Sequence, residues 1–139
     1  MTGGSDPCPI CDHGEPLDVL ARLPASWLTM NQRAPARGYV CVVCAVHAVE
    51  LHDLPEATSM QFLRDMRTVS RALVEVTGAA KLNYEIHGNT IAHLHMHIYP
   101  RYPGDRFEGR PIDPRELDPP VYGEGEFALL RRALLQALD

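Results

Sequence analysis

The alternation of hydrophobic and polar residues along the chain predicts five β-strands. Short apolar runs that are rich in β-branched residues and bounded by glycine, proline or asparagine are typical of strands. Five such segments occur, at residues 17–23, 26–31, 39–46, 81–86 and 94–99. The segment at 39–46 is apolar at almost every position, which indicates a strand that is buried on both faces.

A longer segment, from about Asp53 to Gly78, predicts the main helix. Its apolar residues recur at steps of four and three between Phe62 and Val76, so they form one core-facing stripe. Asp53 is predicted to be the N-cap, with Glu56 completing a capping box, and Gly78 is predicted to end the helix.

The last third of the chain has a different character. Residues 101–125 are rich in proline and glycine, which predicts an extended, irregular arm. An amphipathic helix is expected from about Glu124 to Leu138. The order of elements indicates an α+β fold in which one main helix and a C-terminal helix pack on an antiparallel sheet of about five strands. We expect one domain over residues 1–105, with the arm and helix of residues 106–139 packed on it.

The length, charge and composition of the chain limit the classes of function that it can have. The 139 residues suffice for one hydrophobic core, and the net charge of −5 disfavours a protein that coats nucleic acid. No apolar run reaches the roughly 20 residues that span a bilayer, and residues 1–7 do not resemble a secretion signal. We therefore expect a cytoplasmic protein that acts on neither membranes nor nucleic acid. In that compartment the four cysteines are expected to be thiols or metal ligands rather than disulfides.

The segment from His93 to Tyr99 carries the candidate chemistry. Side chains alternate along a strand, so His93, His95 and His97 are predicted to share one face. The residues between them are apolar and would face the core: Leu94, Met96 and Ile98. Three imidazoles in a row are costly to bury, so they indicate a functional site, and neutral imidazole is both a nucleophile and a metal ligand. The strand by itself does not decide between a catalytic row and a metal-binding row.

The flanking residues make the chain resemble the histidine triad superfamily. The sequence from His93 to Tyr99 fits the pattern His-φ-His-φ-His-φ-φ, where φ is apolar, and Gly88-Asn89-Thr90 matches the glycine, amide and hydroxyl residues that precede the triad. Asn31 and the strand leading to His47 resemble the first half of that domain. The resemblance covers about residues 8–103.

The resemblance implies a nucleotide hydrolase with a covalent intermediate. The middle histidine, His95, would attack phosphorus to form a nucleotidyl-histidine that water then hydrolyses. His97 would contact the transferred phosphate, and Asn89 and Thr90 would contact the phosphate or the leaving group. Asn31 would bind the nucleoside, although it could equally be a turn residue. The third triad position here is a histidine, His97, and in this the chain resembles the hydrolase branches of the superfamily. The substrates implied are dinucleoside polyphosphates or nucleoside phosphoramidates, and a homodimer is expected from the family.

The N-terminal Cys-x-x-Cys pair points to a metal. In some histidine triad proteins such a pair binds zinc together with two histidines, and the matching set here is Cys8, Cys11, His47 and His93. Four protein ligands leave no open position, so this zinc would be structural.

Two other ligand sets are possible. Cys41 and Cys44 could join Cys8 and Cys11, but residues three apart on a strand point to opposite faces, so we expect them in the core. His13 could replace His47. His52 and His87 are expected on the surface or in loops, with His87 close to the phosphate-binding loop.

Two other functions stay open. The fold could serve as a zinc-stabilised nucleotide-binding or protein-interaction module without catalysis, or the histidine row could bind a catalytic metal.

Overall fold

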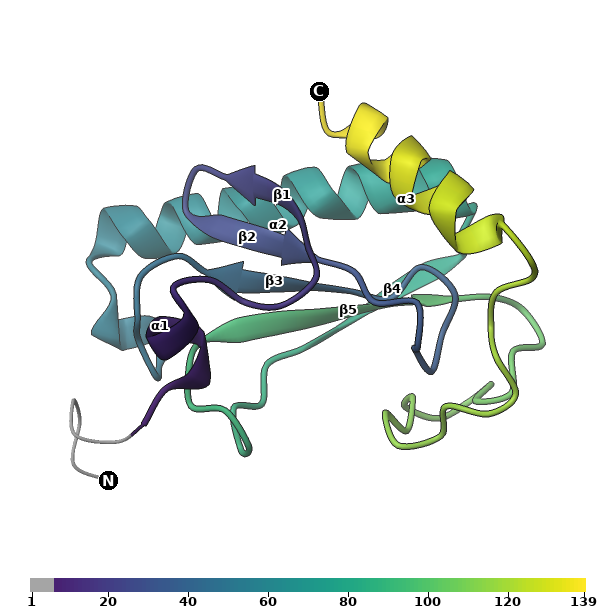
Figure 1. Cartoon of the computed structure of the whole chain (residues 1–139), viewed down its shortest axis with the longest axis horizontal. Helices are drawn as coiled ribbons and strands as arrows, with labels where there is room; N and C mark the ends of the chain where they lie inside the picture. The colour runs from purple at the N-terminus through teal and green to yellow at the C-terminus, as the bar shows by residue number, and fades with distance from the viewer. Residues whose placement is uncertain (1–6) are drawn as a thin grey trace.

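The computed structural model describes residues 7–139, and it folds as an antiparallel sheet with α2 and α3 on one face (Figure 1). The strand order is β1-β2-β3-β5-β4. The strands are β1 (Val19–Leu23), β2 (Ser26–Thr29), β3 (Val40–Cys44), β4 (Lys81–Glu85) and β5 (His95–Arg101). The helices are α1 (Pro9–His13), the 3-10 helix η1 (Leu51–Asp53), α2 (Glu56–Thr77) and α3 (Glu126–Ala137). The predicted α+β class with an antiparallel sheet is confirmed.

The main core lies between the sheet and α2. Phe62 and Leu73 of α2 are fully buried in one cluster with Val42 of β3 and Ile98 of β5. The predicted apolar stripe of the helix therefore faces the sheet. All five residues of β3 are buried, as its unbroken apolar sequence predicted, because β3 is the middle strand of the sheet.

The predicted N-cap at Asp53 is wrong. The helix α2 begins at Glu56, with Pro55 at its N-cap position. Leu54 precedes a proline and is extended (φ −82°, ψ 148°), because the proline ring disfavours a helical residue before it. Asp53 instead ends η1, where its carboxylate accepts a hydrogen bond from the backbone N–H of Glu50 at 3.0 Å.

The C-terminal part of the chain covers the sheet on both sides. The helix α3 contacts α2, and its Leu130 and Leu134 are buried in the main core. The arm between β5 and α3 forms no helix or strand within the described residues, and it lies away from α1 (Figure 1). Phe107 and Ile112 of the arm form a second buried cluster with Tyr99, on the face of β5 that carries the histidines. The arm is therefore anchored beside the candidate site.

Within residues 7–139, no helix has both the length and the apolar character to cross a membrane. Residues 1–6, on which the expectation of no secretion signal partly rests, lie outside the described residues.

Candidate catalytic cleft and metal site

The strand β5 presents two histidines on one face. His95 and His97 lie two positions apart, and their ring centroids are 4.8 Å apart. Leu94 and Ile98 are buried on the opposite face in the main core, which fixes the orientation of the strand. His93 lies just before β5, so the strand itself holds two of the three triad histidines.

A backbone contact fixes the ring of His95. Its Nδ1 lies 2.6 Å from the carbonyl oxygen of His93. A carbonyl can only accept, so Nδ1 carries the hydrogen and Nε2 of the neutral ring keeps a free lone pair. His95 is half-buried and lines a cleft. The residue therefore has the tautomer that a nitrogen nucleophile requires.

His97 is held as a neutral imidazole. The Tyr39 hydroxyl is hydrogen bonded to Nδ1 of His97 at 2.7 Å, and the rings of Tyr39 and Tyr99 stack near it. Burial, followed by the charges of His95 and His87, lowers the pKa of His97 to about 4. Burial also raises the pKa of Tyr39, so its hydroxyl stays protonated. At neutral pH, His97 can donate one hydrogen bond but carries no positive charge.

A cleft of about 720 Å³ opens beside these histidines. Asn89 and Thr90 line it together with His95 and His97, so all four residues predicted to be catalytic lie around one cleft. Residues 111–115 of the arm also line this cleft and so form part of its wall. The sequence pattern did not predict this wall, because nothing in the proline-rich arm indicates where it packs.

Asn31 does not line that cleft. Its side chain donates a hydrogen bond to Asp18 at 2.7 Å and accepts one from the backbone N–H of Arg33 at 2.7 Å. The contact with a residue two positions ahead is an Asx turn, which is the alternative expected for this residue. Asn31 lines two other hollows of the surface, so its role in nucleoside binding stays a prediction.

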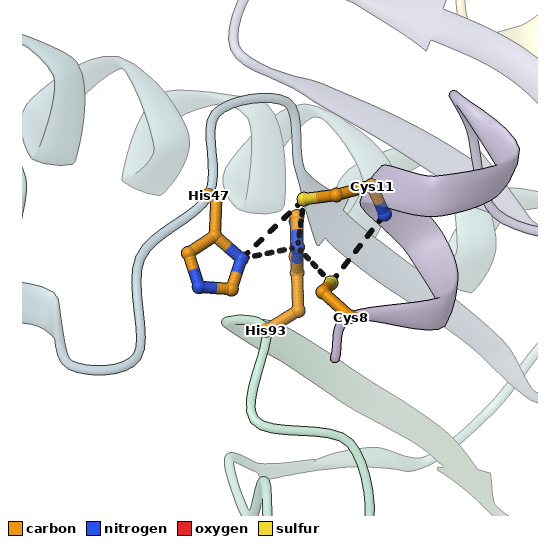
Figure 2. Close-up of side chains that lie close together, drawn as sticks. All are labelled: Cys8, Cys11, His47 and His93. Carbon is orange, nitrogen blue, oxygen red and sulfur yellow. Dashed lines mark hydrogen bonds between the residues drawn. The ribbon is translucent and has the colours of Figure 1, made fainter. Parts of the chain in front are cut away.

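Four potential metal ligands converge just before the start of β5. Cys8 and Cys11 come from α1 and its N-cap, His47 follows β3, and His93 precedes β5 (Figure 2). Their ligand atoms all lie within 4.8 Å of one another. The short helix α1 was not predicted, because its five residues carry no periodic apolar pattern.

The distances in this cluster match a tetrahedral zinc site. Metal–sulfur and metal–nitrogen bonds of about 2.3 and 2.05 Å at tetrahedral angles place N···N pairs about 3.4 Å apart and S···N pairs about 3.6 Å apart. The Nδ1 atoms of His47 and His93 are 3.2 Å apart. The Sγ–Nδ1 distances are 3.4 Å from Cys8 to His93, 3.5 Å from Cys11 to His47 and 3.6 Å from Cys11 to His93. The cluster is therefore suited to a metal ion.

A second contact prepares His93 as a ligand. Its Nε2 donates a hydrogen bond to the Cys44 carbonyl at 2.7 Å, which leaves the lone pair on Nδ1, the atom that faces the cluster. The carbonyl of His93 also accepts the hydrogen bond from His95. One residue thus connects the metal cluster to the candidate nucleophile.

The other candidate ligands lie outside the cluster. Cys41 and Cys44 are buried on β3, as expected for core residues. His13 is exposed, and its Nδ1 is hydrogen bonded to the Glu15 carbonyl at 3.0 Å. Neither alternative set is brought together among the described residues.

Known proteins resemble the chain in sequence and in fold. The HIT domain family matches residues 14–104. A histidine triad protein from Bradyrhizobium japonicum is 30% identical, with a TM-score of 0.77 over 87% of this chain and 90% of that one. A zinc-bound histidine triad family protein from Mycobacterium smegmatis is 27% identical, with a TM-score of 0.68 over 93% and 94% of the two chains. A hypothetical histidine triad nucleotide-binding protein from Sulfolobus tokodaii is 19% identical and shares the fold, with a TM-score of 0.69 over 94% and 89%. No curated protein matches the chain.

Proposed function

Because the chain belongs to the HIT domain family, we propose that it is a nucleotide hydrolase that cleaves a P–O or P–N bond of a nucleoside phosphate through a covalent nucleotidyl-His95. The observation that carries the proposal is the tautomer of His95, which leaves Nε2 free, in a residue that lines one cleft with Asn89 and Thr90. The resemblance to a histidine triad nucleotide-binding protein supports the substrate class.

The first step is displacement at phosphorus. Nε2 of His95 attacks, the P–X bond breaks, and the electron pair leaves with X, which takes up a proton. Tyr39 can donate to Nδ1 of His97, which leaves the N–H at Nε2 to donate to a phosphate oxygen. Asn89 and Thr90 offer neutral donors for charge that develops in the transition state.

The second step returns the enzyme to its starting state. Water attacks phosphorus, loses a proton to a base, and the P–N bond to His95 breaks with its electron pair returning to Nε2. The hydrogen bond from Nδ1 to the His93 carbonyl is kept throughout. It stabilises the positive ring that exists while Nε2 is bonded to phosphorus, since a hydrogen bond to a charged group is stronger than a neutral one.

The proposed zinc has a structural role. Cys8, Cys11, His47 and His93 would supply four protein ligands, so no position is left for substrate or water. The resemblance to the zinc-bound mycobacterial protein supports zinc as the metal. When bound, zinc would hold α1 against the loop after β3 and fix the residue that orients His95.

The test is a comparison of wild type with His95→Ala. Each is mixed with a dinucleoside polyphosphate and with a nucleoside phosphoramidate, turnover is followed by chromatography, and acid-free intact mass spectrometry detects a nucleotidyl adduct. His52→Ala, a replacement of an exposed histidine on η1, is the matched control. We expect turnover and an adduct in wild type and control, and neither in His95→Ala. Nucleotide binding without turnover in wild type would instead support the non-catalytic module.

We also propose a homodimer, as is expected for this family. The strand β4 is an edge of the sheet, and its Tyr84 and the following Ile86 expose apolar side chains. Light scattering after size exclusion measures the mass, and a monomer across the working concentration range would contradict the proposal. The cytoplasmic location, the absence of nucleic-acid and membrane partners, and the domain boundary near residue 105 stay predictions.

A further inference from the structure

A fourth histidine, outside the triad, stands in the same cleft. His87 follows β4, and its ring centroid lies 5.9 Å from that of His97 at an angle of 49°. Its side chain is 52% exposed, so it lines the cleft without being part of the core. From the sequence, His87 was expected close to the phosphate-binding loop, and no role was predicted for it.

Glu85 holds the ring of His87. Nε2 of His87 lies 2.9 Å from Oε1 of Glu85, and since a carboxylate only accepts, Nε2 carries the hydrogen. Glu85 is the register partner of His97 across the β4–β5 pair, so the carboxylate lies on the histidine face of the sheet. Among the described residues, Oε2 of Glu85 is a buried side-chain oxygen that has no hydrogen-bond partner.

This arrangement leaves Nδ1 of His87 free for a proton. A histidine gains a positive charge when Nδ1 is protonated, and the nearby carboxylate offsets that charge. The other charged groups of the cleft do not compete for Glu85. Asp113 and Arg115, on the arm, form an ion pair with each other at 3.0 Å.

His97 is poorly suited to supply the leaving-group proton. Its pKa is lowered to about 4, chiefly by burial, so it is neutral at pH 7. Its Nδ1 is already hydrogen bonded to the Tyr39 hydroxyl. Losing its remaining hydrogen would create an imidazolate in a half-buried site, and Arg115, the arginine that lines the cleft, is already paired with Asp113.

We propose that His87, oriented by Glu85, is a catalytic residue that protonates the leaving group and then activates water. This inference rests on the proposed function. In the first step, the proton on Nδ1 of His87 moves to X as the P–X bond breaks. In the second step, the attacking water gives its proton back to Nδ1. One proton leaves and one returns, so each catalytic cycle restores His87.

The chemistry selects a class of substrate. A leaving group that is a poor base needs no proton, whereas an alkylamine or an alkoxide leaves slowly without one. The Glu85–His87 pair therefore favours a nucleoside phosphoramidate of an alkylamine, in which nitrogen must be protonated to leave.

The test compares two leaving groups in His87→Gln. Single-turnover release is measured for an adenosine phosphoramidate of a primary alkylamine and for an adenosine 5′-phosphate 4-nitrophenyl ester. General acid catalysis contributes on the order of 100-fold or more, so we expect release of the amine to slow by about that factor and release of nitrophenol by less than ~3-fold. His52→Gln is the matched control and should match wild type with both.

A second variant separates positioning from proton transfer. Glu85→Gln keeps the size of the side chain but removes its charge, so amine release should slow by ~10-fold, with nitrophenol release again nearly unchanged. The adduct formed from the nitrophenyl ester should also persist longer in His87→Gln than in wild type, because water lacks its base.

The outcomes distinguish the two proposals. Equal slowing of both leaving groups in His87→Gln, or no slowing of either, would overturn the role of His87 while the adduct on His95 still stands. Failure of the wild type to form any adduct with the nitrophenyl ester would overturn the proposed function and this inference with it.

Discussion

The metal cluster yields the sharpest prediction for stability. His47→Ala removes one of the four converging ligands, and because His47 is exposed, the substitution creates no core cavity. We expect the variant to lose zinc and to unfold at a lower temperature than wild type. His13→Ala is the matched control, since His13 is also exposed, lies close to Cys11 in sequence and stands outside the cluster.

The magnitude follows from linkage between binding and folding. Zinc present at about 1,000 times its dissociation constant stabilises the folded state by about 4 kcal/mol. An unfolding entropy of about 2.1 cal/mol/K per residue gives about 0.29 kcal/mol/K for a chain of 139 residues. The ratio predicts that zinc removal lowers the Tm by about 14 °C.

The assay combines metal analysis with thermal unfolding. Zinc is counted by mass spectrometry of the purified proteins, and unfolding is followed by circular dichroism with and without a chelator. The chelator should lower the Tm of wild type and of His13→Ala, and should have little effect on His47→Ala. Cobalt substitution should give the visible absorption of a tetrahedral thiolate site in wild type. The same absorption should be absent in His47→Ala. A wild type that holds no stoichiometric zinc, or whose Tm ignores the chelator, would refute the reasoning.

Three further predictions concern buried or constrained residues. Asp65 is 2% exposed and accepts hydrogen bonds from the turn between β1 and β2, so Asp65→Ala should lower the free energy of unfolding by about 3 kcal/mol in urea titrations; a loss below ~1 kcal/mol would contradict this. Gly38 has φ +86°, and an added Cβ would lie 2.8 Å from Cγ2 of Thr77, so Gly38→Ala should cost about 2 kcal/mol or more in the same assay, and an unchanged midpoint would count against it. His97 should titrate near pH 4 in NMR spectra rather than near 6.5. Since its folded-state pKa is lowered, its contribution to stability is complete above about pH 6.5 and is lost as the pH falls toward 4; a midpoint near 6.5 would show that the ring is more exposed to solvent than the structure indicates.

The strands and main helix could be predicted because their patterns are local. The alternation around Leu94 and Ile98 and the stripe from Phe62 onward are set by which faces must be buried, so they correctly indicated a helix packed on a sheet. The predicted start of α2 was wrong because Asp53 and Glu56 fit a capping box by spacing alone. Pro55 keeps Leu54 extended, so the helix begins at Glu56 instead.

For the candidate site too, the sequence predicted the residues whose placement depends on local spacing and missed those whose placement depends on the fold. The spacing of the histidines identified His95 and His97, since alternation along a strand needs no knowledge of the rest of the fold. Tyr39 was missed as a site residue, although it begins the predicted strand at 39–46, because its contact with His97 depends on the β3–β5 register. Glu85 was missed for the same reason on the other side of the strand.

The sequence by itself determined the five strands, the two longer helices, the triad and the residues able to bind a metal, because each depends on spacing along one segment. Only the tertiary structure decided which of these residues meet. It placed Cys8 and His93, 85 positions apart, at a distance that one ion can bridge, and it seated the arm against the histidine face. Such contacts are set by the packing of the whole chain, since the free energy that holds distant side chains together comes from the burial of the shared core rather than from the residues at the site.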